Sequence, residues 1–167
     1  GAYTCVVNTE SSAPAMLTVN MNTTIDSHPL SASKCEGDDA IFSVSASGSS
    51  LTYQWEKDGV NLSDGGSVNG SSTPVLTITG VLSSDAGVYR CIVSGACTST
   101  GSNPATLTVN QNTQITLQPS GSTLCEGSSI TLNVSSDGSL LNYQWKKNGV
   151  NISDGGSISG STTANLN

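Results

Sequence analysis

The sequence predicts an all-β protein built from tandem repeats, and two observations carry this prediction. The 167 residues are rich in Ser, Thr, Asn, Gly and β-branched residues, which suit short strands joined by polar turns. Two stretches, beginning at Cys35 and Cys125, align almost without gaps 90 residues apart. This period is too long for helical solenoids and fits a string of small β-sandwich domains.

Within each repeat, apolar and polar residues alternate as they do in half-buried strands, so one face of each strand is expected to point inward. The expected inward residues are Ala40, Phe42, Val44, Leu51, Tyr53 and Trp55 in the first copy, and Ile130, Leu132, Val134, Leu141, Tyr143 and Trp145 in the second. Asp58-Gly59 follows the last of these strands, and Asn148-Gly149 takes its place in the copy. Both pairs predict two-residue hairpin turns, because both turn positions require a positive φ.

Three further features resemble the immunoglobulin fold of the intermediate set: the Glu36-Gly37 turn, Trp55, and the run Asp85-Ala86-Gly87-Val88-Tyr89-Arg90-Cys91. The resemblance implies tandem Greek-key β-sandwiches. It also implies that Trp55, Tyr89, Cys91 and Trp145 are core anchors, and that the Tyr hydroxyl returns to the backbone at the corner before its strand. The Cys-Glu-Gly turns and the Cys between the last two strands are similar to immunoglobulin-like repeats of very large bacterial surface proteins, including gliding and adhesion proteins of the Bacteroidota type.

This resemblance divides the chain into three parts. Residues 1–20 correspond to strands F and G of one domain, residues 21–110 to a complete domain, and residues 111–167 to strands A through the start of E. Gly1 aligns with Gly87 and Asn167 with Thr77, so the two partial domains lack only positions 78–86 between them. We therefore expect a segment of a longer repetitive protein, whose end pieces are completed by residues beyond the segment or by an adjacent copy, as in a filament.

The five cysteines fall into two groups. An immunoglobulin domain usually joins strands B and F by a disulfide, but here strand F carries Cys5 or Cys91 and the strand B position is Val44 or Val134. The usual bridge is therefore not expected, and we interpret Cys5 and Cys91 as small buried hydrophobes.

Cys35, Cys97 and Cys125 are the disulfide candidates, and they belong to turns. In an immunoglobulin sandwich the A–B and F–G turns lie at opposite poles, which separates Cys35 from Cys97 by most of a strand length. We hypothesise that Cys97 bonds to a Cys-Glu-Gly cysteine of the preceding domain or of a neighbouring copy. Unpaired surface thiols and a bridge within a domain that has a distorted strand A are the alternatives. Turn cysteines favour an oxidising, extracellular setting.

The composition argues against several functions. With 5 Lys and Arg against 12 Asp and Glu, the chain has no basic footprint for nucleic acid or anionic lipid. No apolar run in this segment is long enough for membrane insertion. His28 is the only histidine and is expected in a solvated loop, while none of the lysines is expected in the core beside a carboxylate, so we expect no enzyme activity.

Cofactors and metals are not expected either. Asp38, Asp39, Asp64 and Asp85 match no calcium loop, and the copy replaces Asp38-Asp39 with serines, so a solvated acidic surface is the expected role. Five Asn-x-Ser/Thr sequons would be glycosylated only by a host with that machinery.

The sequence thus favours a structural and adhesive segment of a large secreted or surface-anchored protein, in which each domain is a rigid spacer. Its expected partners are neighbouring immunoglobulin-like domains or copies of the same protein, with host, substrate-surface or glycan ligands open. The alternative is a ligand- or carbohydrate-recognition module of a secreted or receptor protein. The B–C, C′–D and F–G loops carry no aromatic residue, which favours the spacer.

Overall fold

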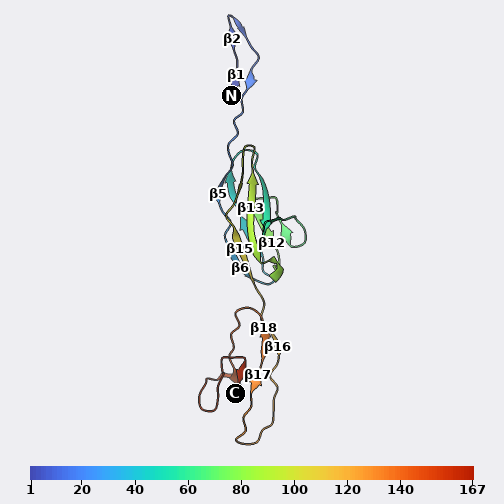
Figure 1. Ribbon diagram of the computed structural model, residues 1–167, viewed down its shortest axis with the longest axis vertical. Helices are drawn as coiled ribbons and strands as arrows, with labels where there is room; N and C mark the ends of the chain where they lie inside the picture. Colours follow the sequence, from blue (N-terminus) through green and yellow to red (C-terminus); the bar gives the residue numbers. More distant parts are fainter.

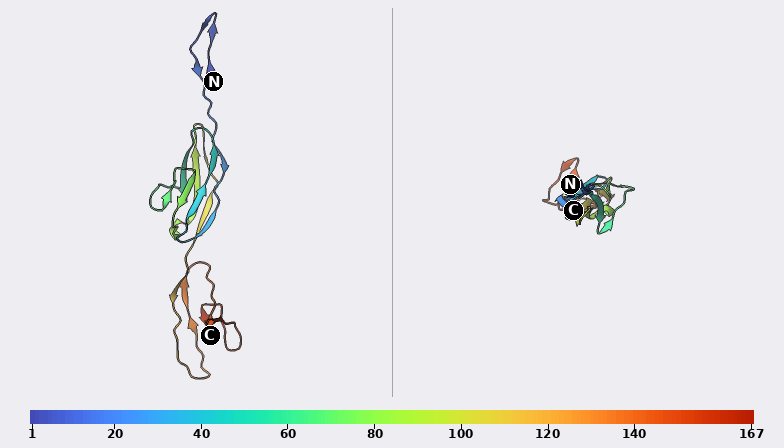
Figure 2. Two further views of the ribbon diagram at one scale, coloured as in Figure 1. Left: turned by 180° about the vertical axis from the view of Figure 1, so that it is seen from behind. Right: turned by 90° about the horizontal axis from the view of Figure 1, so that it is seen from above.

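The chain forms a rod of three consecutive units, as the computed structural model of residues 1–167 shows (Figure 1). We name them the N-terminal hairpin (residues 1–20), the central sandwich (residues 21–110) and the C-terminal unit (residues 111–167). Two further views show the same linear arrangement (Figure 2). The structure contains strands and one 3-10 turn but no α-helix, which confirms the predicted all-β class. No helix is long and apolar enough to span a membrane.

The central sandwich has two main sheets. The larger has the order β10-β9-β13-β15-β6 with β14 added to β13, the smaller has the order β11-β12-β7, and β5 pairs separately with β8. Its strands are β5 (Thr24–Ser27), β6 (Ala32–Cys35), β7 (Ala40–Ser43), β8 (Ser45–Ser47), β9 (Thr52–Lys57), β10 (Val60–Asn61), β11 (Val68–Asn69), β12 (Val75–Ile78), β13 (Gly87–Ser94), β14 (Ser99–Gly101) and β15 (Ala105–Asn110), with the 3-10 turn η1 (Ser83–Asp85).

The core lies between these sheets, because alternate residues of each strand point inward. In β7, for example, Ala40 and Phe42 are buried while Ile41 and Ser43 are exposed. Every buried hydrophobic residue of the chain belongs to this one cluster: Ala40, Phe42, Val44, Trp55, Leu76, Ile78, Val81, Tyr89, Cys91, Val93, Ala105 and Leu107. The other two units therefore have no closed core of their own.

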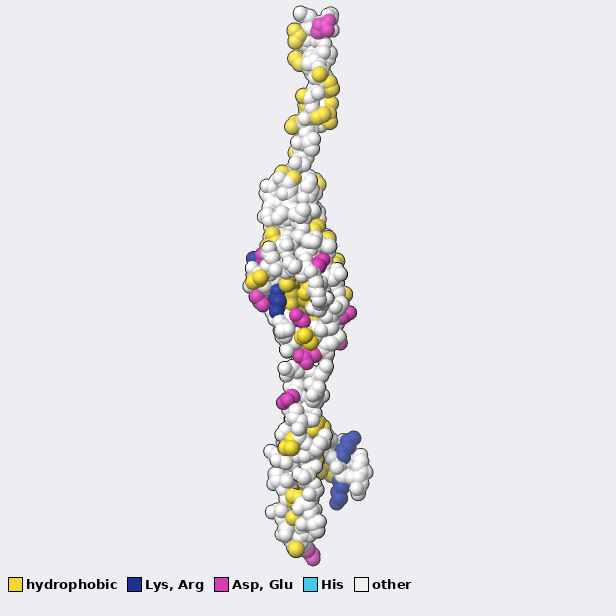
Figure 3. Space-filling view, turned by 90° about the vertical axis from the view of Figure 1, so that its right-hand side faces the viewer, with side chains coloured by type: hydrophobic (Ala, Val, Ile, Leu, Met, Phe, Trp, Pro, Cys, Tyr) yellow, Lys and Arg dark blue, Asp and Glu magenta, His cyan; other side chains and the backbone are white.

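The N-terminal hairpin has the register of the last two strands of the sandwich. Its strands are β1 (Ala2–Tyr3), β2 (Val6–Val7), β3 (Glu10–Ser11) and β4 (Ala15–Met16). Tyr3 pairs with Ala15 just as Tyr89 pairs with Ala105 in the β13–β15 ladder. The strands of the hairpin pair only with one another, and hydrophobic side chains lie exposed along the hairpin at the upper end of the rod in Figure 3.

The C-terminal unit repeats the first part of the sandwich. Its strands are β16 (Gln114–Leu117), β17 (Leu132–Asn133), β18 (Ser135–Asp137), β19 (Lys146–Lys147), β20 (Val150–Asn151) and β21 (Asn165–Leu166). The pairings of β16 with β18 and of β17 with β21 reproduce those of β5 with β8 and β7 with β12 at positions 90 residues earlier.

One difference separates this unit from its counterpart. The sandwich extends β9 over Thr52–Lys57 because six of its residues pair with β13, whereas in the C-terminal unit only Lys146–Lys147 is in a ladder. No strand equivalent to β13 lies beside residues 142–145. Trp145, expected in the core, is consequently part-buried, while Trp55 is fully buried.

Candidate functional site: the domain junctions

The centre of the sandwich is a cluster of aromatic residues from three strands. Trp55 lies on β9 and donates a hydrogen bond from Nε1 to the Thr73 carbonyl oxygen at 2.9 Å. Phe42 stacks on Tyr89 with 4.9 Å between ring centroids. The Tyr89 hydroxyl donates to the Asp85 carbonyl oxygen at 2.6 Å, which is the corner contact that the resemblance implies. These rings are enclosed, so they hold the fold and offer no surface to a ligand.

Burial also governs the chemistry of this cluster. Burial, and secondarily the carboxylates of Asp85 and Asp58, raises the pKa of the Tyr89 phenol above its ordinary value. Burial likewise raises the pKa of the Cys91 thiol to about 11. A thiol with a raised pKa is a weak nucleophile at neutral pH, so Cys91 is not a reactive centre.

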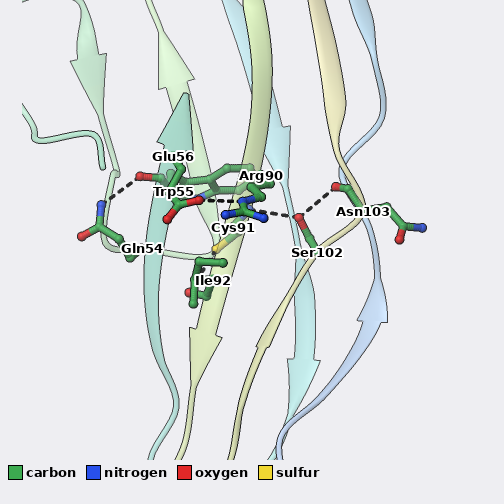
Figure 4. Close-up of polar contacts among 8 residues, drawn as sticks. All are labelled: Gln54, Trp55, Glu56, Arg90, Cys91, Ile92, Ser102 and Asn103. Atoms are coloured by element: carbon green, nitrogen blue, oxygen red, sulfur yellow. Dashed lines mark hydrogen bonds and ion pairs between the residues drawn. The ribbon is translucent and has the colours of Figure 1, made fainter. Parts of the chain in front are cut away.

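The contacts around Cys91 are structural (Figure 4). Its backbone N–H donates to Ser102 Oγ at 3.0 Å and links β13 to the chain that leads into β15. Next to it, Arg90 and Glu56 form the one ion pair, at 2.6 Å on the outer face. The same serine contact recurs in the N-terminal hairpin, where the Cys5 N–H donates to Ser12 Oγ at 3.0 Å.

The two predicted turns have the backbone that their sequences require. Asp58 and Gly59 have φ angles of 51° and 82°, and Asn148 and Gly149 have 51° and 81°. Asp58 also accepts a hydrogen bond from the Val88 N–H through Oδ1 at 2.9 Å. The turns join β9 to β10 and β19 to β20, at the side of the rod, so they lie away from the junctions between units.

All five cysteines are free thiols. Cys91 is buried, while Cys5 is exposed, contrary to the interpretation as a buried hydrophobe, because no second sheet covers the N-terminal hairpin. Cys35, Cys97 and Cys125 are exposed, and no disulfide forms within the chain. Cys97 Sγ lies 3.7 Å from the Asn20 carbonyl oxygen at the upper junction. Cys35 pairs with Asn110 at the lower junction.

The lower junction, between the central sandwich and the C-terminal unit, contains no free linker. Asn110 is the last residue of β15, and its carbonyl oxygen accepts from the Glu36 N–H at 2.9 Å. Gln111, the next residue, donates from its N–H to Ser139 Oγ at 2.9 Å in the unit that follows. Asn112 reaches back and donates from Nδ2 to the Glu36 carbonyl oxygen at 3.0 Å. Consecutive residues are therefore fixed to opposite units.

The upper junction repeats one of these contacts 90 residues earlier. The Met21 N–H donates to Ser49 Oγ at 2.9 Å, as Gln111 does to Ser139. The Thr23 hydroxyl and N–H both bond to Thr98 in the turn that carries Cys97. The two junctions thus share the contact between the first residue of a unit and a serine of that unit.

The acidic residues have a role that the sequence reasoning missed. They were expected to form a solvated surface, but each holds a turn by accepting a backbone N–H: Asp38 from Cys35, Asp39 from Gly80, Asp64 from Ser71 and Asp85 from Leu82. The Ser71 hydrogen bonds lower the pKa of Asp64 below its ordinary value. The sequence signal for this turn-holding role was the position of each Asp beside Gly or Ser in a turn.

No cluster of His, Cys, Asp and Glu side chains is arranged to hold a metal ion. His28 is exposed, as expected of a loop residue, and its Nδ1 accepts a hydrogen bond from the Asn103 N–H at 3.0 Å. A polar hollow at the lower junction is lined by Glu36, Gln111, Asn112, Gln114, Asp137 and neighbouring small residues.

Residues 24–95 match the family model described as "Immunoglobulin domain". No curated protein matches the chain.

Among solved structures, the chain is similar to Sidekick-1 immunoglobulin domains 1–5, with 22% identity and a TM-score of 0.67 over 99% of this chain and 39% of that one. It is similar to Drosophila OTK extracellular domains 3–5, with 19% identity and a TM-score of 0.61 over 93% and 55%. It is also similar to tandem Ig repeats of Dlar, with 20% identity and a TM-score of 0.53 over 66% of this chain and 62% of that one. The chain spans less than two thirds of each of these structures. At such identities the likeness concerns the fold, and the chain has the all-β fold of tandem immunoglobulin-like domains.

Proposed function

We propose that the chain is a rigid spacer segment of an extracellular structural or adhesive array. The observation that carries this proposal is the lower junction, where Asn110 is bonded into one unit and Gln111 into the next. This arrangement restricts bending, because no unbonded linker residue separates Asn110 from Gln111. The serine contact recurs at the upper junction, between Met21 and Ser49, and supports the same restriction there.

Extracellular placement is part of the proposal. Its support is the fold likeness to proteins that include the extracellular domains of Drosophila OTK, together with thiols positioned at both poles of the domains. The proposed bacterial surface origin rests on the sequence resemblance alone. The proposal includes no enzyme activity, because the buried ionisable groups serve packing and turns.

Adhesion in this proposal comes from repetition and not from a single pocket. Tandem domains present many weak contact surfaces at fixed spacing, which raises avidity without a strong individual site. Lengthwise disulfides between the turn cysteines of successive domains would lock that spacing. The alternative, a recognition module for glycans, is less favoured at the lower junction, because the hollow there is polar and has no aromatic side chain.

Small-angle scattering of the monomer fraction, separated by in-line chromatography, tests the rigidity. We expect a narrow, rod-like distance distribution for the wild type. Insertion of Gly-Ser-Gly-Ser between Asn110 and Gln111 should broaden it, whereas the same insertion between Gly65 and Gly66, in an exposed loop, should not. A wild-type profile as broad as that of the junction insertion would refute the rigid spacer.

A further inference from the structure

The same four-residue pattern lies at both junctions. Residues 20–23 read Asn-Met-Asn-Thr and residues 110–113 read Asn-Gln-Asn-Thr, so only the second position differs. Each pattern begins on the last residue of one unit and continues into the first residues of the next. We name residues 20–23 the upper connector and residues 110–113 the lower connector.

The lower connector is bonded alternately to the two units that it joins. The Asn110 carbonyl oxygen accepts from the Glu36 N–H at 2.9 Å, and Asn112 donates from Nδ2 to the Glu36 carbonyl oxygen at 3.0 Å. Both asparagines are therefore held by one residue of the preceding unit. Between them, Gln111 bonds to Ser139 of the following unit through its N–H at 2.9 Å and its carbonyl oxygen at 3.2 Å. These contacts use only the backbone of the second position, which is why its side chain can differ between the connectors.

The last residue of the upper connector is held inside the central sandwich. Thr23 is 7% exposed. Its N–H donates to Thr98 Oγ1 at 2.9 Å, and its hydroxyl donates to the Thr98 carbonyl oxygen at 2.8 Å. Thr98 belongs to the turn between β13 and β14. Because a buried hydroxyl needs a hydrogen-bond partner, this pair of bonds fixes the place where the connector enters the sandwich.

The same turn makes room for the threonine with a glycine. A Cβ on Gly95 would lie 2.3 Å from Thr23 Oγ1 and 3.0 Å from the Ser49 carbonyl oxygen. Gly95 is not among the glycines with a positive φ, so the close approach of the connector, and not the backbone conformation, requires glycine at this position. The shape of the turn is therefore matched to the residue that it holds.

We propose that the Asn-x-Asn-Thr connector sets the orientation of successive domains. Asn112 is the positioning residue toward the preceding unit, and Thr23 is the positioning residue toward the unit that follows. The inference rests on the spacer function and deepens it, because it assigns the direction of the rod to named side chains.

The orientation that the connector would hold is visible in the side loops. The segment between β10 and β12 and its counterpart between β20 and β21 project from opposite sides of the rod (Figures 1 and 2). Successive units are thus rotated about the long axis, and a connector bonded to both units restricts that rotation.

The threonine contact is tested by amide hydrogen exchange in the full 167-residue chain, followed by NMR. Thr98→Val removes the hydroxyl that accepts the Thr23 N–H, so exchange of the Thr23 amide should accelerate about fivefold while the amides of β13 keep their protection. Thr100→Val, in the neighbouring strand β14, is the matched control, because the Thr100 hydroxyl takes part in no hydrogen bond. Equal exchange of the Thr23 amide in the two variants would overturn its positioning role.

The steric match is tested with a double-mutant cycle. Gly95→Ala should accelerate exchange of the residue 23 amide by more than about tenfold, because the added Cβ meets Thr23 Oγ1. In a Thr23→Ala background that oxygen is absent, so the same substitution should have a much smaller effect. Gly101→Ala is the control, because its Cβ meets only the end of the Ile92 side chain, at 3.3 Å. Additive effects in the cycle would contradict a turn shaped for Thr23.

Orientation itself is measured by small-angle scattering of the monomer fraction. Asn112→Ala removes the side-chain contact with Glu36 and should broaden the distance distribution. Asn103→Ala, which replaces an exposed asparagine within the sandwich, should not. Both variants should keep the wild-type melting temperature of the central sandwich. A narrow wild-type profile that Asn112→Ala leaves unchanged refutes the connector alone, whereas a broad wild-type profile refutes the spacer function together with it.

Discussion

The corner hydrogen bond of Tyr89 gives the sharpest stability prediction. Tyr89→Phe keeps the stacked ring on Phe42 and removes only the hydroxyl that donates to the Asp85 carbonyl oxygen at 2.6 Å. A net buried hydrogen bond contributes about 1 kcal/mol, and the part-buried carbonyl that loses its donor adds to the cost, so we expect a loss of about 1.5 kcal/mol.

This loss of free energy corresponds to a shift in the melting temperature. The central sandwich has 90 residues, from Met21 to Asn110. At about 2.1 cal/mol/K per residue, its unfolding entropy is about 190 cal/mol/K, so 1.5 kcal/mol lowers Tm by about 8 °C. The assay is thermal unfolding followed by Trp55 fluorescence in a Trp145→Phe background. Tyr53→Phe is the matched control, because the Tyr53 hydroxyl takes part in no hydrogen bond. Equal Tm values for the two variants would refute the reasoning.

The same residue predicts a response to alkali. Burial raises the pKa of Tyr89 in the folded state, so its contribution to stability is fully present below the unfolded value near 10 and is lost as the pH rises above it. The Tm difference between the wild type and Tyr89→Phe should therefore narrow from pH 8 to pH 11. A gap that is constant across this range would show that the phenol titrates normally.

Three other perturbations have defined outcomes. Burial raises the pKa of Cys91 from 9.0 to about 11 on folding. The stability of the wild type, measured by urea denaturation, should therefore fall between pH 9 and pH 11, and that of Cys91→Ala should fall less. An equal fall in both proteins would contradict the burial of this thiol. Gly70→Ala places a Cβ 2.2 Å from the Val75 carbonyl oxygen at a φ of +85°, and should lower the free energy of unfolding by more than about 3 kcal/mol. Gly66→Ala, whose Cβ meets open space, should lower it by about 1 kcal/mol. Similar chemical denaturation midpoints for the two variants would contradict this difference. The lowered pKa of Asp64 means that its contribution is present above pH 4 and lost as the pH falls below it, so Tm of Asp64→Asn should depend less on acid than that of the wild type.

Much of the fold was readable from local patterns. The alternation of Ala40, Phe42 and Val44 marks one inward face, and that face is buried in the structure. The 90-residue repeat predicted tandem sandwiches because each copy repeats the same alternation and turns. Side-chain direction in a strand follows sequence position, so such patterns need no tertiary information.

The candidate site depended on contacts that sequence could not supply. The carboxylate of Asp39 accepts a hydrogen bond from the N–H of Gly80, which lies 41 positions away in the chain. This contact requires the two turns to meet in space. Trp145 has a local sequence similar to that of Trp55 but remains part-buried, because burial depends on a neighbouring strand and not on the strand itself.

The sequence by itself determined the all-β class, the repeat and the inward faces, since these depend on residue type and period. Only the tertiary structure decided that Asn110 and Gln111 are bonded to different units, and that Cys97 lies beside Asn20. Such contacts join residues distant in the chain, and their geometry arises from how sheets pack and where domains meet. The sequence places Cys97 in a turn at one end of the domain, and the packed junction shows that its neighbour there is Asn20.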